Sequence, residues 1–232
     1  MKLPKKFLLE NIGNQIFRRE AILQALQNKN FEKAISFAND GIKQDAKDKP
    51  GLVKEWINWL LKIALAQNDT PKIVRHARFL FTDNFSREQN YYQLLKNNVA
   101  ADKWNDFLEE IITEIETRNR WNDLHLLANI FIAEQWWNRL MKLVQQNVSL
   151  PIIDQYENHL AKDYAPELAQ LYEVCIIEYL KQNVSRSHYQ TACKYLRRMI
   201  KLGEKERVKF LIENFKNQYS QRKALLEELD KV

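Results

Sequence analysis

The chain has 232 residues, of which 45% are apolar and 11% aromatic, so it can bury a substantial core and does not have the composition of a disordered protein. With only four glycines and five prolines it has few turn residues for a strand-rich fold, and this composition favours helices joined by short polar corners. The formal net charge is +6, from 36 Lys and Arg against 30 Asp and Glu.

The N-terminal segment, MKLPKKFLLENIGNQIF, mixes basic, polar and apolar residues, and no small-residue cleavage site follows it, so it is not a secretory signal. The most apolar stretch, GLVKEWINWLLKIALAQ, is interrupted by Lys54, Glu55, Asn58 and Lys62 and is too polar to span a membrane. We therefore expect a soluble, cytoplasmic protein that does not bind membranes.

Polar corners such as Asn28-Lys29-Asn30 and Gln67-Asn68-Asp69 separate successive apolar stretches along the chain. The first stretch, residues 5–27, is one long helix or two short ones that meet near Gly13. Helices are predicted at 5–27, 30–44, 50–67, 71–83, 86–98, 102–117, 120–134, 136–146, 150–162, 166–182, 186–202 and 204–229.

A stripe of apolar residues recurs in these helices at offsets 0, 3, 4 and 7, which places its members on one face of a helix. In one copy, Thr70 is expected to be the N-cap, with Pro71 at the first helical position. The copies are Phe31/Ala34/Ile35/Ala38, Thr70/Ile73/Val74/Ala77, Trp104/Phe107/Leu108/Ile111, Trp121/Leu124/His125/Ala128, Trp137/Leu140/Met141/Val144 and Tyr189/Ala192/Cys193/Leu196.

The spacing of these copies also repeats. Their first residues lie 39, 34, 17, 16 and 52 positions apart, and a unit of about 17 residues is one helix plus one corner. Two such units make a helical hairpin, and a stack of hairpins buries stripes that one hairpin leaves exposed. We therefore predict an all-α fold, a tetratricopeptide-like α-α superhelix of antiparallel hairpins, in a single domain covering residues 1–232. The alternative is an irregular helical bundle.

No motif of a metal, cofactor or catalytic site is present. The chain lacks HExxH, GxxxxGK[ST], GxGxxG and GxSxG, and its four histidines are not at ligand spacing with its cysteines. Cys175 and Cys193 lie in apolar helical stretches and are expected to be reduced core thiols. We predict no catalytic residue, no cofactor and no enzymatic activity.

The excess charge is concentrated at the C-terminal end. Residues 183–232 contain 12 Lys and Arg against 6 Asp and Glu, whereas the preceding 182 residues contain 24 of each. Such a patch can bind phosphate backbones. Solvated or structural side chains explain it better, and Arg222 could equally tie the last helix to its neighbour. The candidate cationic residues are Arg186, Arg197, Arg198, Lys201, Arg222 and Lys223.

The adjacent pair Trp136 and Trp137 cannot place both rings on one helix face. One ring therefore lies at a seam between helices or in the open, where an exposed tryptophan would anchor a partner. Trp136 is included among the candidate interaction residues for this reason.

The C-terminal stretch resembles the end of bacterial SWIM-type zinc-finger proteins. The resemblance is carried by Tyr189-x-x-Ala192-x-x-Tyr195-Leu196, Leu202-Gly203, Phe210-Leu211 and Tyr219-x-x-Arg222-x-Ala224-Leu225-x-x-Glu228-Leu229, and by FEKAISFANDGIKQD further upstream. The zinc motif of that family, CxCx(n)CxH, is absent here, so no zinc ligand carries over to any residue. The resemblance implies a helical scaffold accessory to a SWIM-type finger, with zinc only where that upstream motif is present.

These observations lead to two hypotheses. The first is a non-catalytic scaffold for protein–protein interaction, which should contain an exposed apolar or aromatic groove lined by several helices. The second is nucleic-acid binding through the basic C-terminal hairpin, residues 185–229, which should place its arginines and lysines on one open face.

Overall fold

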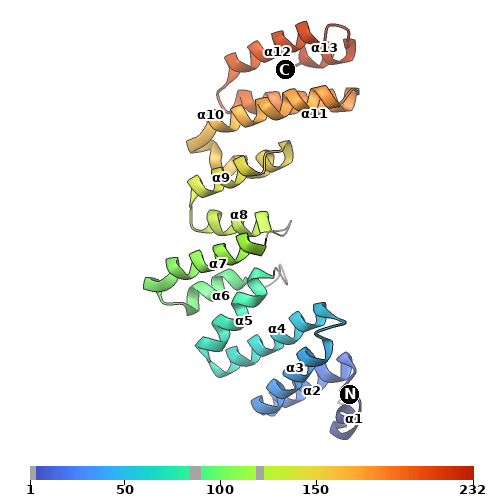
Figure 1. The fold of residues 1–232 in the computed structure, drawn as a ribbon, viewed down its shortest axis with the longest axis vertical. Helices are drawn as coiled ribbons and strands as arrows, with labels where there is room; N and C mark the ends of the chain where they lie inside the picture. Colours follow the sequence, from blue (N-terminus) through green and yellow to red (C-terminus); the bar gives the residue numbers. More distant parts are fainter. Residues whose placement is uncertain (1–3, 84–89, 119–122) are drawn as a thin grey trace. The chain divides into compact units, whose positions relative to one another are not determined.

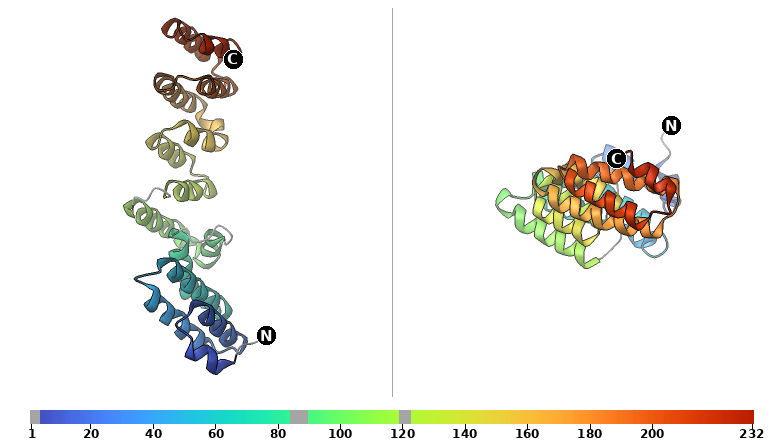
Figure 2. Two further views of the ribbon diagram at one scale, coloured as in Figure 1. Left: turned by 90° about the vertical axis from the view of Figure 1, so that its right-hand side faces the viewer. Right: turned by 90° about the horizontal axis from the view of Figure 1, so that it is seen from above.

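The computed structural model describes residues 4–83, 90–118 and 123–232, and Figure 1 shows their arrangement. Within these residues every regular element is a helix, with 13 α-helices, one short 3-10 helix and no strand. Within each part of the chain, helices that follow one another pack as adjacent antiparallel pairs (Figures 1 and 2). The all-α prediction is confirmed.

The helices group into two compact units, Met1–Asp123 and Leu124–Val232, which are described separately. The prediction of a single domain over residues 1–232 stays a prediction. None of the helices in the described ranges is both long and apolar enough to cross a membrane.

The N-terminal unit is built mainly from consecutive helices that each pack on the next. The strongest packing joins α2 to α3, α3 to α4, α4 to α5 and α5 to α6. Its helices are α1 (Lys5–Glu10), α2 (Gln15–Gln27), α3 (Phe31–Asp45), α4 (Pro50–Gln67), α5 (Thr70–Thr82), α6 (Tyr91–Asn98), the 3-10 helix η1 (Ala101–Lys103) and α7 (Trp104–Arg118).

The core of this unit is centred on Trp56 of α4, whose side chain is completely buried. Small residues of α3 make room for it: an added Cβ on Gly41 would lie 2.9 Å from carbon atoms of the indole ring. The α3–α4 contact is therefore closer than any larger residue at position 41 would permit. The cluster around this contact consists of Ile22, Ala25, Ala34, Ala38, Trp56, Leu60 and Ile63.

The C-terminal unit has one very long segment, α10, against which α9 and α11 both pack. Helix α11 in turn contacts α12 and α13, and Gly203, with φ of +96°, makes the corner between α11 and α12. The helices of this part of the chain are α8 (Asp123–Ala133), α9 (Trp137–Gln146), α10 (Leu150–Gln182), α11 (Arg186–Lys201), α12 (Lys205–Gln218) and α13 (Lys223–Leu229).

Several predicted boundaries are confirmed and others are corrected. The stretch 5–27 forms two helices, which settles the alternative left open near Gly13. The N-cap of α5 is Asp69 and not Thr70, because the Asp69 carboxylate accepts a 3.2 Å hydrogen bond from the backbone N–H of Lys72. The first part of the helix predicted at 86–98, and Trp121 at the head of one stripe, lie outside the described residues.

Two helices of the C-terminal unit differ from prediction in opposite ways. The segments 150–162 and 166–182 are one element, α10, bent at Tyr164 two residues before Pro166. The predicted helix 204–229 is wrong, because Tyr219 ends α12 and Arg222 begins α13. The break is stabilised by Arg222, whose guanidinium donates a hydrogen bond to the carbonyl of Leu180 in α10.

Candidate binding groove

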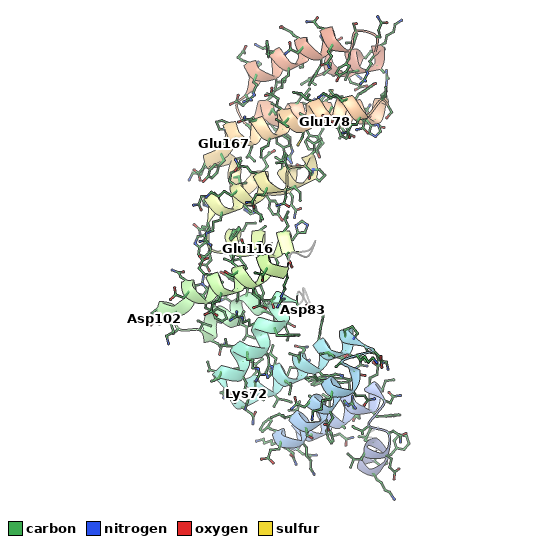
Figure 3. The ribbon with its side chains drawn as sticks, viewed as in Figure 1. Lys72, Asp83, Asp102, Glu116, Glu167 and Glu178 are labelled. Atoms are coloured by element: carbon green, nitrogen blue, oxygen red, sulfur yellow. The ribbon has the colours of Figure 1, made fainter. Side chains whose placement is uncertain are left out.

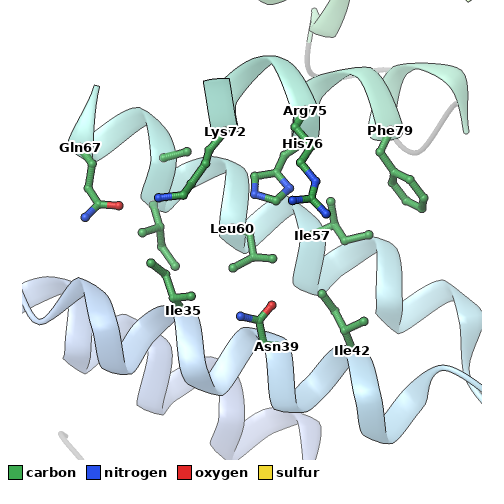
Figure 4. A pocket seen from close by; sticks show the side chains of 12 residues that line it. Ile35, Asn39, Ile42, Ile57, Leu60, Gln67, Lys72, Arg75, His76 and Phe79 are labelled. Carbon is green, nitrogen blue, oxygen red and sulfur yellow. The ribbon is translucent and has the colours of Figure 1, made fainter. Parts of the chain in front are cut away.

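An open groove of about 590 Å³ lies between α3, α4 and α5 of the N-terminal unit (Figure 4). This volume lies in the range of ligand-binding pockets. Figure 4 shows side chains entering it from α3 below and from α5 above, with α4 behind. Its lining residues are Ile35, Asn39, Ile42, Ile57, Leu60, Ile63, Ala64, Gln67, Lys72, Arg75, His76 and Phe79.

Helix α5 positions the groove because it carries two different stripes. Ile73, Ala77 and Leu80 are buried and hold the helix against its neighbours. A second stripe begins at Lys72 and again has offsets 0, 3, 4 and 7, so its members share the helix face that borders the groove. These residues are Lys72, Arg75, His76 and Phe79.

The other side of the groove is largely aliphatic. Ile35 and Ile42 of α3 lie half-buried about two turns apart, with the exposed amide of Asn39 between them. Leu60 of α4 belongs both to the buried core and to the groove lining, so the groove floor is held by the packing around Trp56. At one end the ring of Phe79 is 40% exposed.

The α5 edge is positively charged. Lys72 is paired with Asp69, with 2.7 Å between Nζ and Oδ2, and its side chain lies near the start of α5 in Figure 3. Burial is the main cause that lowers the pKa of His76 below its ordinary value of 6.5, and the positive charges of Arg75 and Lys72 lower it further while Asp69 opposes them. The imidazole is therefore neutral at pH 7, next to a charged guanidinium.

The predicted cationic residues occupy different surroundings, because α11 forms ion pairs on two sides. Toward α10, the Arg198 guanidinium bonds to Asp154 and lies 3.3 Å from Oε1 of Glu157, and Nζ of Lys194 lies 2.8 Å from Oδ2 of Asp154. The buried Glu157 also accepts a 2.7 Å hydrogen bond from the hydroxyl of Tyr172. Arg198 is thus part of a packed ionic network between α10 and α11.

Toward the C-terminus, a second side of α11 is also paired. Arg186 bonds to Glu227 and lies 3.9 Å from Glu228, both on α13. Arg197 donates a 3.2 Å hydrogen bond to the backbone carbonyl of Lys231. These contacts fasten the last turn of the chain to α11.

Arg222 donates a 2.7 Å hydrogen bond to the carbonyl of Leu180, and its guanidinium lies 4.2 Å from the ring centroid of Tyr219. The structural alternative for Arg222 is confirmed: it ties the start of α13 to α10. Lys201 and Lys223, by contrast, are exposed and make no ion pair or hydrogen bond with any described residue. The six cations therefore do not converge on one open face.

Trp136 is half-buried at the start of α9. Its ring lies 6.2 Å from that of Phe131, and the Arg139 guanidinium lies 4.5 Å from the indole centroid. The neighbouring Trp137 stacks on His159 of α10, with 6.2 Å between ring centroids. Both rings thus pack at seams between neighbouring elements, which is one of the two alternatives for this pair.

The histidines and cysteines are dispersed. The imidazoles of His125 and His188 lie within 2.7 Å of the hydroxyls of Tyr156 and Ser185, respectively. Both cysteines are free thiols, with Cys193 fully buried and Cys175 half-buried, and burial raises the pKa of each. In the described residues no group of three or more His, Cys, Asp or Glu is placed to hold a metal ion.

The groove residues were not predicted from the sequence. The predicted stripe of α5 contains the buried Ile73 and Ala77, whereas the half-exposed stripe that borders the groove starts two positions after Thr70. A signal was present, because Lys72, Arg75, His76 and Phe79 have the same helical offsets. The signal is a second face of the same helix, which remains uncovered when the core face is buried.

No family model matches the chain, and no curated protein and no solved structure is significantly similar to it.

Proposed function

We propose that the protein is a non-catalytic helical scaffold that binds a segment of a partner protein in the groove between α3, α4 and α5. The observation that carries this proposal is the groove itself: an open, mostly apolar surface with a few polar groups, formed by three consecutive helices. Helix-in-groove binding uses surfaces of this kind. A tetratricopeptide-like superhelix and an accessory role beside a SWIM-type zinc finger belong to the same proposal.

The proposal is tested by selecting peptides from a displayed library of random dodecamers with the purified full chain. Asn39→Trp places a bulky ring into the groove from an exposed position, so it should block binding without disturbing the core. Asp40→Trp, also exposed on α3 but absent from the groove lining, is the matched control. Selected peptides should lose at least about tenfold in affinity for Asn39→Trp only, about 1.4 kcal/mol.

Equal binding of the selected peptides to the wild type and Asn39→Trp would place their site elsewhere, and enrichment of no peptide at all would overturn the groove as a protein-binding surface. Circular dichroism of both variants establishes that they are folded. The described groove lining contains no nucleophile in contact with a base, so we expect the bound peptide to remain uncleaved.

Nucleic-acid binding through residues 185–229 is the weaker hypothesis. Arg186, Arg197, Arg198 and Arg222 already bond to protein groups, which would have to be exchanged for phosphates. The residues to test are Lys201 and Lys223, whose replacement does not disturb an ion pair. Binding of short DNA or RNA that falls steeply with salt, and that is lost in Lys201→Glu/Lys223→Glu, would support this hypothesis.

A further inference from the structure

We infer that the groove recognises an acidic side chain flanked by aliphatic residues on the bound segment, with Arg75 as the residue that pairs with the carboxylate. This inference rests on the proposed function, and it specifies the chemistry of the partner.

Arg75 differs from the other described arginines of the N-terminal unit. Each of the others has a carboxylate within 4 Å: Arg18 faces Asp45, Arg19 faces Glu55, Arg78 faces Glu110 and Glu114, and Arg118 faces Glu114. Arg75 has neither an ion pair nor a hydrogen bond among the residues that the structure describes, and it lines the groove. Its five N–H donors are therefore available to a ligand.

The charge of the groove has one sign. Lys72, Arg75 and His76 stand together along α5, and no acidic residue belongs to the described lining. Asp69 balances Lys72 at the start of the helix and leaves the positive charge of Arg75 uncompensated. A carboxylate placed here gains a bidentate partner in Arg75 and a hydrogen-bond donor in the neutral imidazole of His76.

The remainder of the groove selects what surrounds that carboxylate. Ile35, Ile42 and Leu60 offer aliphatic surface opposite the cationic edge, and Phe79 of α5 adds an aromatic ring at one end. Asn39 and Gln67 each offer both a donor and an acceptor, the two groups that a polypeptide backbone requires. A peptide segment can hydrogen-bond to both amides, contact the aliphatic wall and form an ion pair with Arg75. An alkyl chain that ends in a carboxylate leaves the two amides without a partner.

The probe is a set of three fluorescent peptides, capped by an N-terminal acetyl and a C-terminal amide so that the only variable charge is on one side chain. The parent is SAALLEALLAAS, and the other two carry Gln or Lys in place of Glu. The wild type should bind the Glu peptide at least about tenfold more tightly than the Gln peptide. Arg75→Glu should reverse the preference and bind the Lys peptide best, whereas Lys103→Gln, an exposed cation outside the groove, should leave the order unchanged.

The outcomes separate this inference from the proposed function. If the Glu and Gln peptides bind equally and Asn39→Trp abolishes both, the groove binds protein segments without reading charge, so the inference is wrong and the proposed function stands. If none of the three peptides binds the wild type with a Kd below about 1 mM, the inference is wrong, and the library selection alone decides the proposed function. Binding of decanoate that depends on Arg75, without binding of the Glu peptide, would also overturn it.

Discussion

The indole Nε1 of Trp56 donates a 2.7 Å hydrogen bond to Oδ2 of Asp45, and both side chains are buried. The same carboxylate oxygen lies 3.7 Å from Nη1 of Arg18, whose guanidinium carbon lies 5.4 Å from the centroid of the indole. Three helices, α2, α3 and α4, are thereby joined through one carboxylate. Because Leu60 lies on the same helix as Trp56 and faces the groove, this cluster also fixes the groove floor.

Removing the indole N–H should destabilise the N-terminal unit. Trp56→Phe leaves Oδ2 of Asp45 with only its longer contact to Arg18, and we expect a loss of about 1–3 kcal/mol in the free energy of unfolding. Urea denaturation followed by circular dichroism measures it. Trp59→Phe, at a half-buried position of the same helix, is the control and should lose less; equal losses would show that ring volume and not the hydrogen bond matters.

Alanine substitutions at Gly41 and Gly51 should have opposite effects on stability. At Gly41 the new methyl group would lie 2.9 Å from the Trp56 ring, so Gly41→Ala should destabilise the protein by about 1–3 kcal/mol. At Gly51, in the first turn of α4, no atom lies within 4 Å of the added Cβ, so Gly51→Ala should be neutral or stabilise by up to about 1 kcal/mol. Thermal unfolding of the two variants side by side checks the signs, and a stabilising Gly41→Ala would contradict the close α3–α4 contact.

In the C-terminal unit, replacing Arg198 should cost more stability than replacing its neighbour Arg197, because of the two only Arg198 pairs with a buried carboxylate. Arg198→Met leaves the buried Glu157 with Tyr172 as its hydrogen-bonding partner and should cost about 1–3 kcal/mol, since an uncompensated carboxylate stays away from water. Arg197→Met removes one exposed hydrogen bond and should cost less than about 1 kcal/mol. Chemical denaturation of both variants provides the comparison, and similar values would mean that the α10–α11 network contributes little.

His76 should titrate below pH 6.5. Its native pKa is lowered, so on acidification the unfolded chain binds a proton at this site before the native protein does, and the stability contributed by the neutral ring is lost as the pH falls below 6.5. Proton NMR of the imidazole signals measures the midpoint, with His76→Gln to assign the resonance. Addition of the Glu peptide should move the midpoint upward, and a midpoint above 6.5 in the free protein would contradict the burial and the neighbouring cations that lower this pKa.

The two thiols should react at very different rates. Burial raises the pKa of Cys193 to about 11, and the thiol is inaccessible, so a thiol reagent at pH 8 should leave it unmodified until the protein unfolds. The half-buried Cys175 should react first. Cys175→Ala provides the test: the native variant should show almost no reaction, and a rapid reaction would mean that α11 opens locally.

The sequence predicted the helices well because their boundaries depend on local chemistry. The corner at Asn68-Asp69 and the Gly203 turn are encoded by residues that cap or end helices by themselves. The break at Tyr219–Arg222 was not predictable in this way, since the Arg222 side chain ends that stretch by binding Leu180, some forty residues earlier. A long-range contact of this kind leaves no local periodicity.

The candidate site shows the same contrast between local features, which the sequence predicts, and long-range contacts, which it does not. The basic end is evident from the distribution of charge in the sequence. The pairing of its cations is not, because it depends on which carboxylates the fold brings near, and Asp154 and Glu157 lie about forty residues before Arg198. The groove escaped prediction for a related reason. A half-exposed stripe on α5 borders a groove only because α3 and α4 supply the facing aliphatic wall.

The double stripe of α5 has an evolutionary consequence. Ile73, Ala77 and Leu80 are constrained by the volume of the interior, so selection for folding acts on them. The stripe at 72, 75, 76 and 79 faces solvent and the groove, and its side chains can change without repacking the interior. If the groove binds a partner as proposed, its preference can therefore diverge among descendants of this chain while the same scaffold is inherited intact.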